Sequence, residues 1–110
     1  MFLGQTLLSS PASGEVVKSE KSLDSVRLGT GSKIIVLKIH SASKTDAKAA
    51  VEELKIKYGI SKLNVVIANA GILRSFTTVL DSSSEEFNEL FTVNTLGPVL
   101  LFRATWPLLD

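Results

Sequence analysis

Residues 63–71 read Leu-Asn-Val-Val-Ile-Ala-Asn-Ala-Gly. The aliphatic and β-branched run over 63–68 predicts a strand that is covered on both faces, as in a parallel sheet. The small residues and the glycine that follow predict a tight turn where a ligand can approach the backbone closely. Because open α/β sheets bind ligands at the carboxyl ends of their strands, we expect a site at this turn.

A second strand is predicted upstream, over residues 33–39, which contain another aliphatic run. Between the two strands, apolar residues at helical spacing predict a helix that begins at Ser43 or Thr45, with Asp46 near its positive end. Gly59 is expected to end this helix as a left-handed cap. The strand–helix–strand order implies parallel strands. The predicted fold class is therefore α/β.

A long helix is expected over residues 83–109. Residues 82–85, Ser-Ser-Ser-Glu, fit a capping box at its start. An apolar stripe at helical spacing follows it. Pro98 falls inside this stripe, so the sequence predicts a kink there.

Residues 1–32 differ from the rest of the chain. They are rich in serine and glycine and have no sustained hydrophobic period, and only Val16-Val17 hints at a strand. We therefore expect an irregular N-terminal segment over 1–32 and one domain over 33–110. The sequence has no internal repeat.

Charge and composition exclude several functions. The chain has 12 basic and 11 acidic residues, so nucleic acid and membrane surfaces are not expected partners. It has no cysteine and one histidine, so no metal site is expected. The longest apolar stretch, 99–109, is broken by Arg103 and Pro107, and the first residues do not resemble a signal peptide. We expect a cytoplasmic protein.

Two motifs carry a resemblance to a known family. Residues 65–71 resemble the Asn-Asn-Ala-Gly motif of short-chain dehydrogenases/reductases, with Ala68 in the place of the first asparagine. Downstream, residues 91–98, Phe-Thr-Val-Asn-Thr-Leu-Gly-Pro, resemble the long helix of that family. The sequence of residues 102–109 is most similar to fungal ketoreductases of the norsolorinic acid ketoreductase type. The resemblance implies a partial Rossmann-like, doubly wound parallel sheet over 33–110.

The same resemblance implies an NAD(P)-dependent oxidoreductase that acts on small carbonyl or alcohol substrates. In the family, the turn matched by Asn69, Ala70 and Gly71 lines the adenosine side of the cofactor. The alternative is that Asn69 only satisfies backbone groups of the turn. His40 stands where many members have an aspartate that accepts from the adenine amino group. It could accept less strongly, or it could be a solvent-facing residue at a strand end.

Asn94 is the candidate catalytic residue. In the family, the backbone carbonyl of the matching asparagine holds a water of the proton relay. In a helix, the carbonyl of residue 94 would accept from the N–H of residue 98, but Pro98 has no N–H. The carbonyl is thus free to accept from water or a lysine. The alternative is a proline kink whose carbonyl simply meets solvent.

Two stretches imitate family motifs. Tyr58 and Lys62 match Tyr-x-x-x-Lys in letters, but Gly59 breaks the helix between them, so the i,i+4 alignment fails. We expect Tyr58 to be the last apolar contact of its helix. Residues 29–31, Gly-Thr-Gly, precede a strand, whereas a phosphate loop must follow one, so they predict a turn.

Several parts of the family pattern have no counterpart here. The glycine-rich loop, the serine and the catalytic tyrosine–lysine pair are missing, which predicts a fragment without activity of its own. The alternative is an interaction module, or a homo-oligomer, that uses helix 83–109. In the family order 3-2-1-4-5-6 the two strands are numbers three and four. Residues 1–32 offer no clear strands for the gap, so we expect direct pairing or loose packing, with exposed apolar patches.

Overall fold

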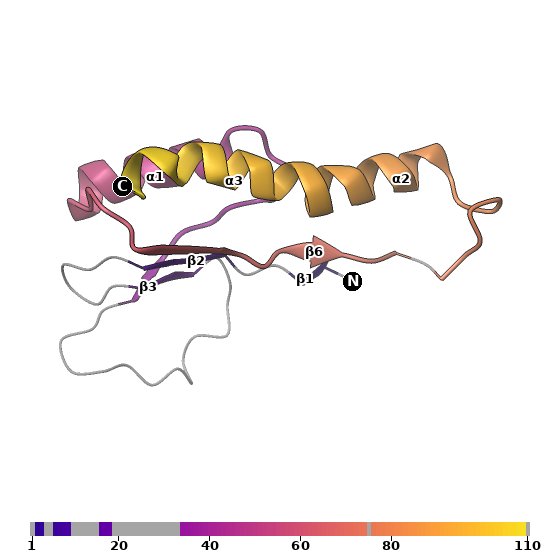
Figure 1. Cartoon of the computed structure of the whole chain (residues 1–110), viewed down its shortest axis with the longest axis horizontal. Coiled ribbons are helices and arrows are strands. Elements are labelled where there is room, and N and C mark those ends of the chain that lie inside the picture. Colours follow the sequence, from indigo (N-terminus) through magenta and orange to yellow (C-terminus); the bar gives the residue numbers. More distant parts are fainter. Residues whose placement is uncertain (1, 4–5, 10–15, 19–33, 75, 110) are drawn as a thin grey trace.

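The computed structural model describes residues 2–3, 6–9, 16–18, 34–74 and 76–109 (Figure 1). The strands in these ranges are β1 (Phe2–Leu3), β2 (Thr6–Ser9), β3 (Val16–Lys18), β4 (Ile34–Val36), β5 (Val65–Ala68) and β6 (Gly71–Ile72). The helices are α1 (Asp46–Tyr58), α2 (Ser84–Phe91) and α3 (Gly97–Thr105). A π-helical turn at Thr92–Leu96 joins α2 to α3, and a 3-10 turn at Trp106–Leu108 follows α3. The predicted turn at 29–31 lies outside the described residues.

The main sheet has the strand order β4-β3-β2-β5. Strand β3 is parallel to β4, whereas β2 is antiparallel to both of its neighbours, β3 and β5. Strands β4 and β5 therefore run in the same direction, as predicted, but two other strands lie between them. The expectation of direct pairing or loose packing is wrong. Strands of three or four residues are too short to show a hydrophobic period in the sequence, and pairing with neighbours defines them instead.

Helices α1 and α3 lie on one face of this sheet, and α2 extends beyond it, past β6 (Figure 1). Val66 packs against the hydrophobic core on that side, while Val65 and Ile67 are exposed. The prediction that β5 is covered on both faces is therefore wrong, and the predicted exposed apolar surface is confirmed. The centre of the core combines the region of β4, helix α1 and the start of β5, and it contains Ile35, Leu37, Ala50, Val51, Leu54, Ile60, Leu63 and Leu108.

Helix α1 ends as predicted. Gly59 has φ 65°, and the backbone N–H of Ile60 donates to the Leu54 carbonyl at 3.0 Å. Tyr58 packs against the core from the last position of the helix, and Lys62 is exposed. The break at Gly59 separates the two residues, as the sequence predicted.

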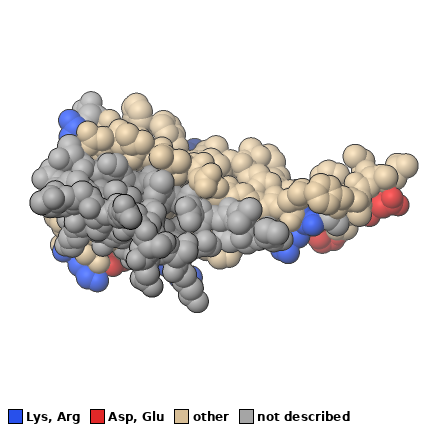
Figure 2. Space-filling view, turned by 90° about the horizontal axis from the view of Figure 1, so that it is seen from below, with Lys and Arg blue, Asp and Glu red and all other residues tan. Residues whose placement is uncertain are grey.

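Helix α2 begins one residue later than the predicted capping box. The Ser83 hydroxyl oxygen accepts from the backbone N–H of Glu86 at 3.1 Å. Before it, the loop between β6 and α2 forms the projecting end of the molecule, where Phe76, Val79 and Leu80 are exposed. Figure 2 shows that this end is mostly uncharged on the face drawn, with acidic side chains at its tip.

Candidate functional site

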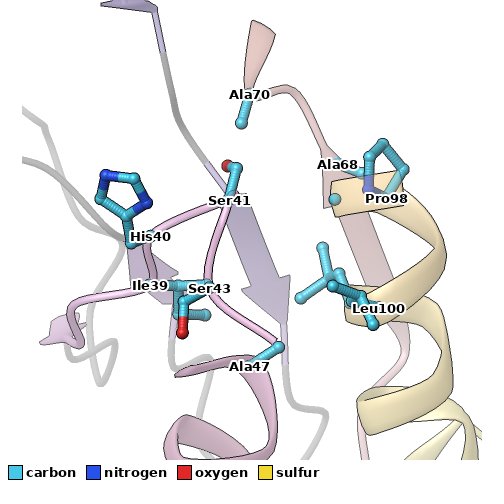
Figure 3. A pocket seen from close by; sticks show the side chains of 11 residues that line it. Ile39, His40, Ser41, Ser43, Ala47, Ala68, Ala70, Pro98 and Leu100 are labelled. Atoms are coloured by element: carbon cyan, nitrogen blue, oxygen red, sulfur yellow. The ribbon is translucent and has the colours of Figure 1, made fainter. Parts of the chain in front are cut away.

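The carboxyl ends of β4 and β5 lie at the same edge of the sheet, because the two strands are parallel. Figure 3 shows the segments that leave the two strands on either side of a small pocket, with Pro98 and Leu100 of α3 beside it. The pocket is lined by Ile39, His40, Ser41, Ser43, Ala47, Ala68, Ala70, Gly97, Pro98, Leu100 and Leu101. This is the edge at which open α/β sheets bind ligands.

Hydrogen bonds from nearby residues hold the loop after β4. The Asp46 carboxylate accepts from the backbone N–H of His40 at 3.0 Å and from the Ser43 hydroxyl at 2.8 Å. The Ser43 oxygen in turn accepts from the backbone N–H of Asp46 at 3.1 Å. Ser43 therefore caps α1 although Thr45 directly precedes the helix. The Nδ1 atom of His40 accepts from the Ala42 N–H at 3.3 Å.

These bonds also affect the ionisation of Asp46. The backbone N–H of His40 is the main cause of a lowered pKa at this carboxyl group, and the Ser43 hydroxyl lowers the pKa further. Both donors stabilise the ionised form more than the neutral form. Each of the two Asp46 carboxylate oxygens therefore accepts a hydrogen bond from the loop after β4.

The turn after β5 is held by a distant side chain. The Asn94 side-chain oxygen accepts from the Ile72 N–H at 2.8 Å, and its side-chain nitrogen donates to the Ile72 carbonyl at 2.9 Å. The amide group thus pairs with one residue of β6 as a neighbouring strand would. A Cβ at Gly71 would lie 3.4 Å from the same asparagine oxygen, so the glycine gives the side chain room.

The helix is irregular where Asn94 projects from it. The N–H of Gly97 bonds to the Thr92 carbonyl, five residues back, which makes residues 92–96 a π-helical turn. A π-helical turn thus lies directly before Pro98, where the sequence predicted a kink. Because Pro98 has no N–H, the Asn94 carbonyl lacks its usual i+4 donor. Asn94 thus clamps the β5 turn with its side chain, and its backbone carbonyl lacks the i+4 donor of a regular α-helix.

Gly97 joins the two halves of the site. A Cβ at this position would lie 3.1 Å from the Ser41 carbonyl oxygen and 3.3 Å from the Ser41 Cβ. Helix α3 therefore approaches the loop after β4 to a distance that a larger residue would not allow. This contact closes the pocket from one side.

The size of the pocket limits what it can hold. Its internal space is about 20 Å³, which is enough for roughly one water molecule. A whole adenine or nicotinamide ring does not fit inside this space. The arrangement is thus a small, partly open corner at the edge where a larger ligand would lie.

The predicted site residues fall into three places. His40 and Ala70 line the pocket together. Gly71 and Asn94 meet at the turn after β5. Asn69 is exposed and is not among the residues that line the pocket. The functional roles of all five remain predictions.

The sequence interpretation missed two contributors to this site. The close contact of Gly97 with Ser41 joins residues 56 positions apart, and no local pattern signals it. The paired roles of Ser43 and Asp46 could have been found from their spacing, because Ser-x-x-Asp is a known helix-start signal.

A metal-binding cluster and a membrane-spanning helix are both absent from the described part of the chain. Residues 34–74 and 76–109, with the short strands before them, contain no group of three or more histidine, cysteine or acidic side chains that could hold a metal ion. Within those same ranges, no helix is both long and apolar enough to span a membrane.

Comparison with known proteins agrees with this geometry. The family model described as short chain dehydrogenase matches residues 7–110. The chain belongs to the short-chain dehydrogenase family. Its α/β architecture is accordingly part of a Rossmann-like fold, with β4 and β5 as parallel strands of the sheet.

Two curated relatives are fungal proteins. Norsolorinic acid ketoreductase of Aspergillus parasiticus is 37% identical over 84 residues, which cover 76% of this chain and 31% of that protein. A short-chain dehydrogenase of Neurospora crassa is 39% identical over 79 residues, with 72% and 31% covered. Among solved structures, the NADPH-bound carbonyl reductase from chicken fatty liver matches with a TM-score of 0.62 and 29% identity, covering 68% of this chain and 29% of that one. The chain spans about a third of the curated relatives it matches.

Proposed function

We propose that this chain is part of an NAD(P)-dependent short-chain oxidoreductase that acts on small carbonyl or alcohol substrates. The observation that carries the proposal is the position of Asn94, whose side chain clamps the turn after β5 while Pro98 removes the usual i+4 donor to its backbone carbonyl. A cytoplasmic location is part of the proposal, because a chain without cysteine needs no oxidising compartment to fold.

The described residues offer a place for only one part of a dinucleotide. The Asn69–Gly71 turn and His40 lie at the carboxyl edge, where the adenosine half would approach. The phosphate half does not fit. A pyrophosphate is held where the carboxyl end of a strand leads through a glycine-rich loop into a helix. Strand β2 is antiparallel and brings its amino end to this edge, and the loop between β4 and α1 contains no glycine. Strand β1 also pairs with β6 just beyond the turn.

It follows that residues 1–110 by themselves do not carry out hydride transfer. We expect no saturable change when NADH or NADPH fluorescence is titrated with the purified chain. Saturable binding at physiological cofactor concentrations would contradict this part of the proposal and would imply a phosphate site elsewhere in the chain.

A chimaera tests the family function directly. Residues 33–110 replace the matching segment of the A. parasiticus ketoreductase, and NADPH-dependent carbonyl reduction is measured. We expect an active enzyme whose kcat falls at least tenfold with Asn94→Ala, since both the clamp and the position of the relay carbonyl are lost. Asn88→Ala, an exposed asparagine on α2, is the matched control. A folded chimaera that is inactive, or in which the Asn94 variant equals the control, would refute the proposal.

A second candidate is docking on intact relatives through the long helix. The observation that favours it is the exposure of aromatic residues along this helix, at Phe87, Phe91, Phe102 and Trp106. Phe102 and Trp106 also contact each other, with ring centroids 5.4 Å apart. Exposed aromatic clusters of this kind are enriched at protein interfaces.

Co-expression with an intact ketoreductase tests this second candidate. Size-exclusion chromatography should show a mixed complex that Phe87→Ser/Phe91→Ser weakens, while Phe76→Ser in the projecting loop leaves it intact. If the chain never elutes with the relative, helix docking is wrong.

A further inference from the structure

An ion pair attaches the chain that leaves β6 to helix α2. Arg74 donates from Nε to one carboxylate oxygen of Glu89 at 2.9 Å, and from a terminal guanidinium nitrogen to the other oxygen. Figure 1 shows this part of the chain running beside α2 toward the projecting loop. A contact through both oxygens fixes orientation as well as distance, because the two planar groups meet in one geometry.

This ion pair and the Asn94 clamp are attachments with matching spacing. Asn94 binds Ile72 and Glu89 binds Arg74, so the extended segment and the helix run in opposite directions. Two residues of extended chain cover about 6.6 Å. Five residues of helix cover about 7.5 Å. An extended segment that binds position 94 through residue 72 therefore reaches position 89 through residue 74.

The π-helical turn brings Glu89 and Asn94 closer to one side of the helix. In a regular α-helix, residues five positions apart are rotated by about 140° from each other and do not share a face. The π-helical turn begins at Thr92, between the two residues, and takes more residues per revolution, so it turns Asn94 back toward the side of Glu89. At this point the Thr92 hydroxyl donates to the Asn88 carbonyl at 2.7 Å, a local bond of the kind that bends helices.

The ion pair restrains a movement that the Asn94 amide alone would allow. Both bonds of the amide go to Ile72, so the segment could pivot about that one residue. Attachment of Arg74, two residues further along, removes the pivot. Packing beyond this point adds little, because Phe76 and Leu80 of the projecting loop are each 95% exposed. The ion pair therefore fixes the angle between the segment and the helix.

We infer that Arg74 and Glu89 are positioning residues for the reductase reaction, because their ion pair sets the orientation in which Asn94 clamps the turn after β5. The inference rests on the proposed function. Neither residue is among those that line the pocket, so both act through Asn94. Their side chains are 51% and 42% exposed, and ion pairs at such positions contribute little to overall stability. The effect is therefore local to the clamp.

Hydrogen exchange on the 110-residue chain measures this coupling. Arg74→Ala should accelerate exchange at the Ile72 amide at least threefold, because the bond to Asn94 opens more often. Arg74→Lys keeps the charge but loses the two-pronged contact, so it should also accelerate exchange at this amide. Arg103→Ala, at an exposed arginine of α3, is the matched control and should leave it unchanged. In the Asn94→Ala background, Arg74→Ala should have no further effect there.

The chimaera that carries residues 33–110 in the A. parasiticus ketoreductase tests the catalytic consequence. Glu89→Gln should lower kcat at least threefold and change the KM for NADPH less than twofold, because the pair acts on Asn94 and not on the cofactor. Glu85→Gln, at an exposed glutamate of the same helix, is the matched control. The exchanged pair Arg74→Glu/Glu89→Arg should recover at least half of the lost kcat. Combined with Asn94→Ala, Glu89→Gln should lower kcat no further.

Several results would overturn the inference. One is unchanged exchange at Ile72 in both Arg74 variants. Another is an active chimaera in which Glu89→Gln equals the Glu85→Gln control, or adds its full effect to that of Asn94→Ala. A loss of kcat that only follows a loss of stability in urea would also overturn it, because the pair would then have a purely structural role. An unmodified chimaera without activity refutes the proposed function instead, and exchange on the 110-residue chain then decides whether the pair orients Asn94.

Discussion

The loop after β4 and the turn after β5 meet at one edge of the sheet, and hydrogen bonds hold both, yet the partners lie at very different distances along the chain. In the β4 loop, Ser43 and Asp46 bind backbone groups that lie no more than six residues away. In the β5 turn, Asn94 reaches Ile72 from 22 residues along the chain. The first segment can form from local sequence, whereas the second depends on where the long helix lies. We therefore expect the β5 turn to be the more sensitive to changes in tertiary packing.

The largest effect is expected where the two segments are joined. Gly97→Val would press a branched side chain against the Ser41 backbone, which cannot move without shifting the loop. Overpacking of this kind costs about 2–3 kcal/mol. Urea unfolding measures the loss, and Gly97→Ala should give a smaller one. If the valine variant were as stable as the original chain, close packing of α3 on the β4 loop would not be needed.

Asn94→Ala should destabilise the turn after β5 and leave the loop after β4 unchanged. Loss of both bonds to Ile72 is expected to lower the free energy of unfolding by about 1–2 kcal/mol. Hydrogen exchange should accelerate at the Ile72 amide and remain unchanged at the His40 amide. Asn88→Ala is the control on the same helical segment. Equal acceleration at both amides would mean that the two segments unfold together.

Ser43→Ala should destabilise the loop after β4 and leave the turn after β5 unchanged. The variant loses the oxygen that accepts from the Asp46 N–H, which typically costs about 1 kcal/mol at a helix start. Exchange should accelerate in the β4 loop and leave Ile72 unchanged. Thr45→Ala, at a residue whose side chain makes no capping bond, should have a smaller effect. A larger loss in the Thr45 variant would reassign the cap.

The smallest effect is a dependence on pH. The pKa of Asp46 is lowered in the folded chain, so its stabilising contribution is present above the unfolded value and is lost as pH falls through the folded value. The stability difference between the original chain and Asp46→Asn should therefore shrink from about pH 5 to about pH 3. The pair Arg74 and Glu89 is present in both proteins and cancels in the difference. A constant difference across this range would rule out an ionised Asp46 as the cause.

Much of this fold could be predicted from local pattern. The apolar run before Asn69 predicted strand β5, and Gly59 marked the end of α1 because only a residue without a side chain adopts its backbone angle easily. The proline at 98 predicted a kink, and the structure has a π-helical turn directly before it. The long helix and the small-residue turn also carried the resemblance that the family match confirmed.

Other features had little or no local signal. Strand β2 showed no period and β3 was hinted at only by Val16-Val17, because strands this short are defined by the neighbours that pair with them. The exposure of Val65 and Ile67 contradicts a pattern that predicted full burial, because burial depends on which layers are present. The residues of the candidate site could be named from the sequence. That His40 and Ala70 line the pocket while Gly71 and Asn94 meet at the turn after β5 could not.

By itself, the sequence determined the elements whose cause is local: the two parallel strands, the capped helix between them, the proline-disturbed long helix and the glycine turn. Backbone angles, capping groups and hydrophobic spacing act over a few residues and can be read in order. The tertiary structure alone decided which strands fill the space between β4 and β5, that Asn94 clamps Ile72, and that α3 touches Ser41. Those contacts join residues far apart in the chain, and their stability comes from packing that exists only once the layers have assembled.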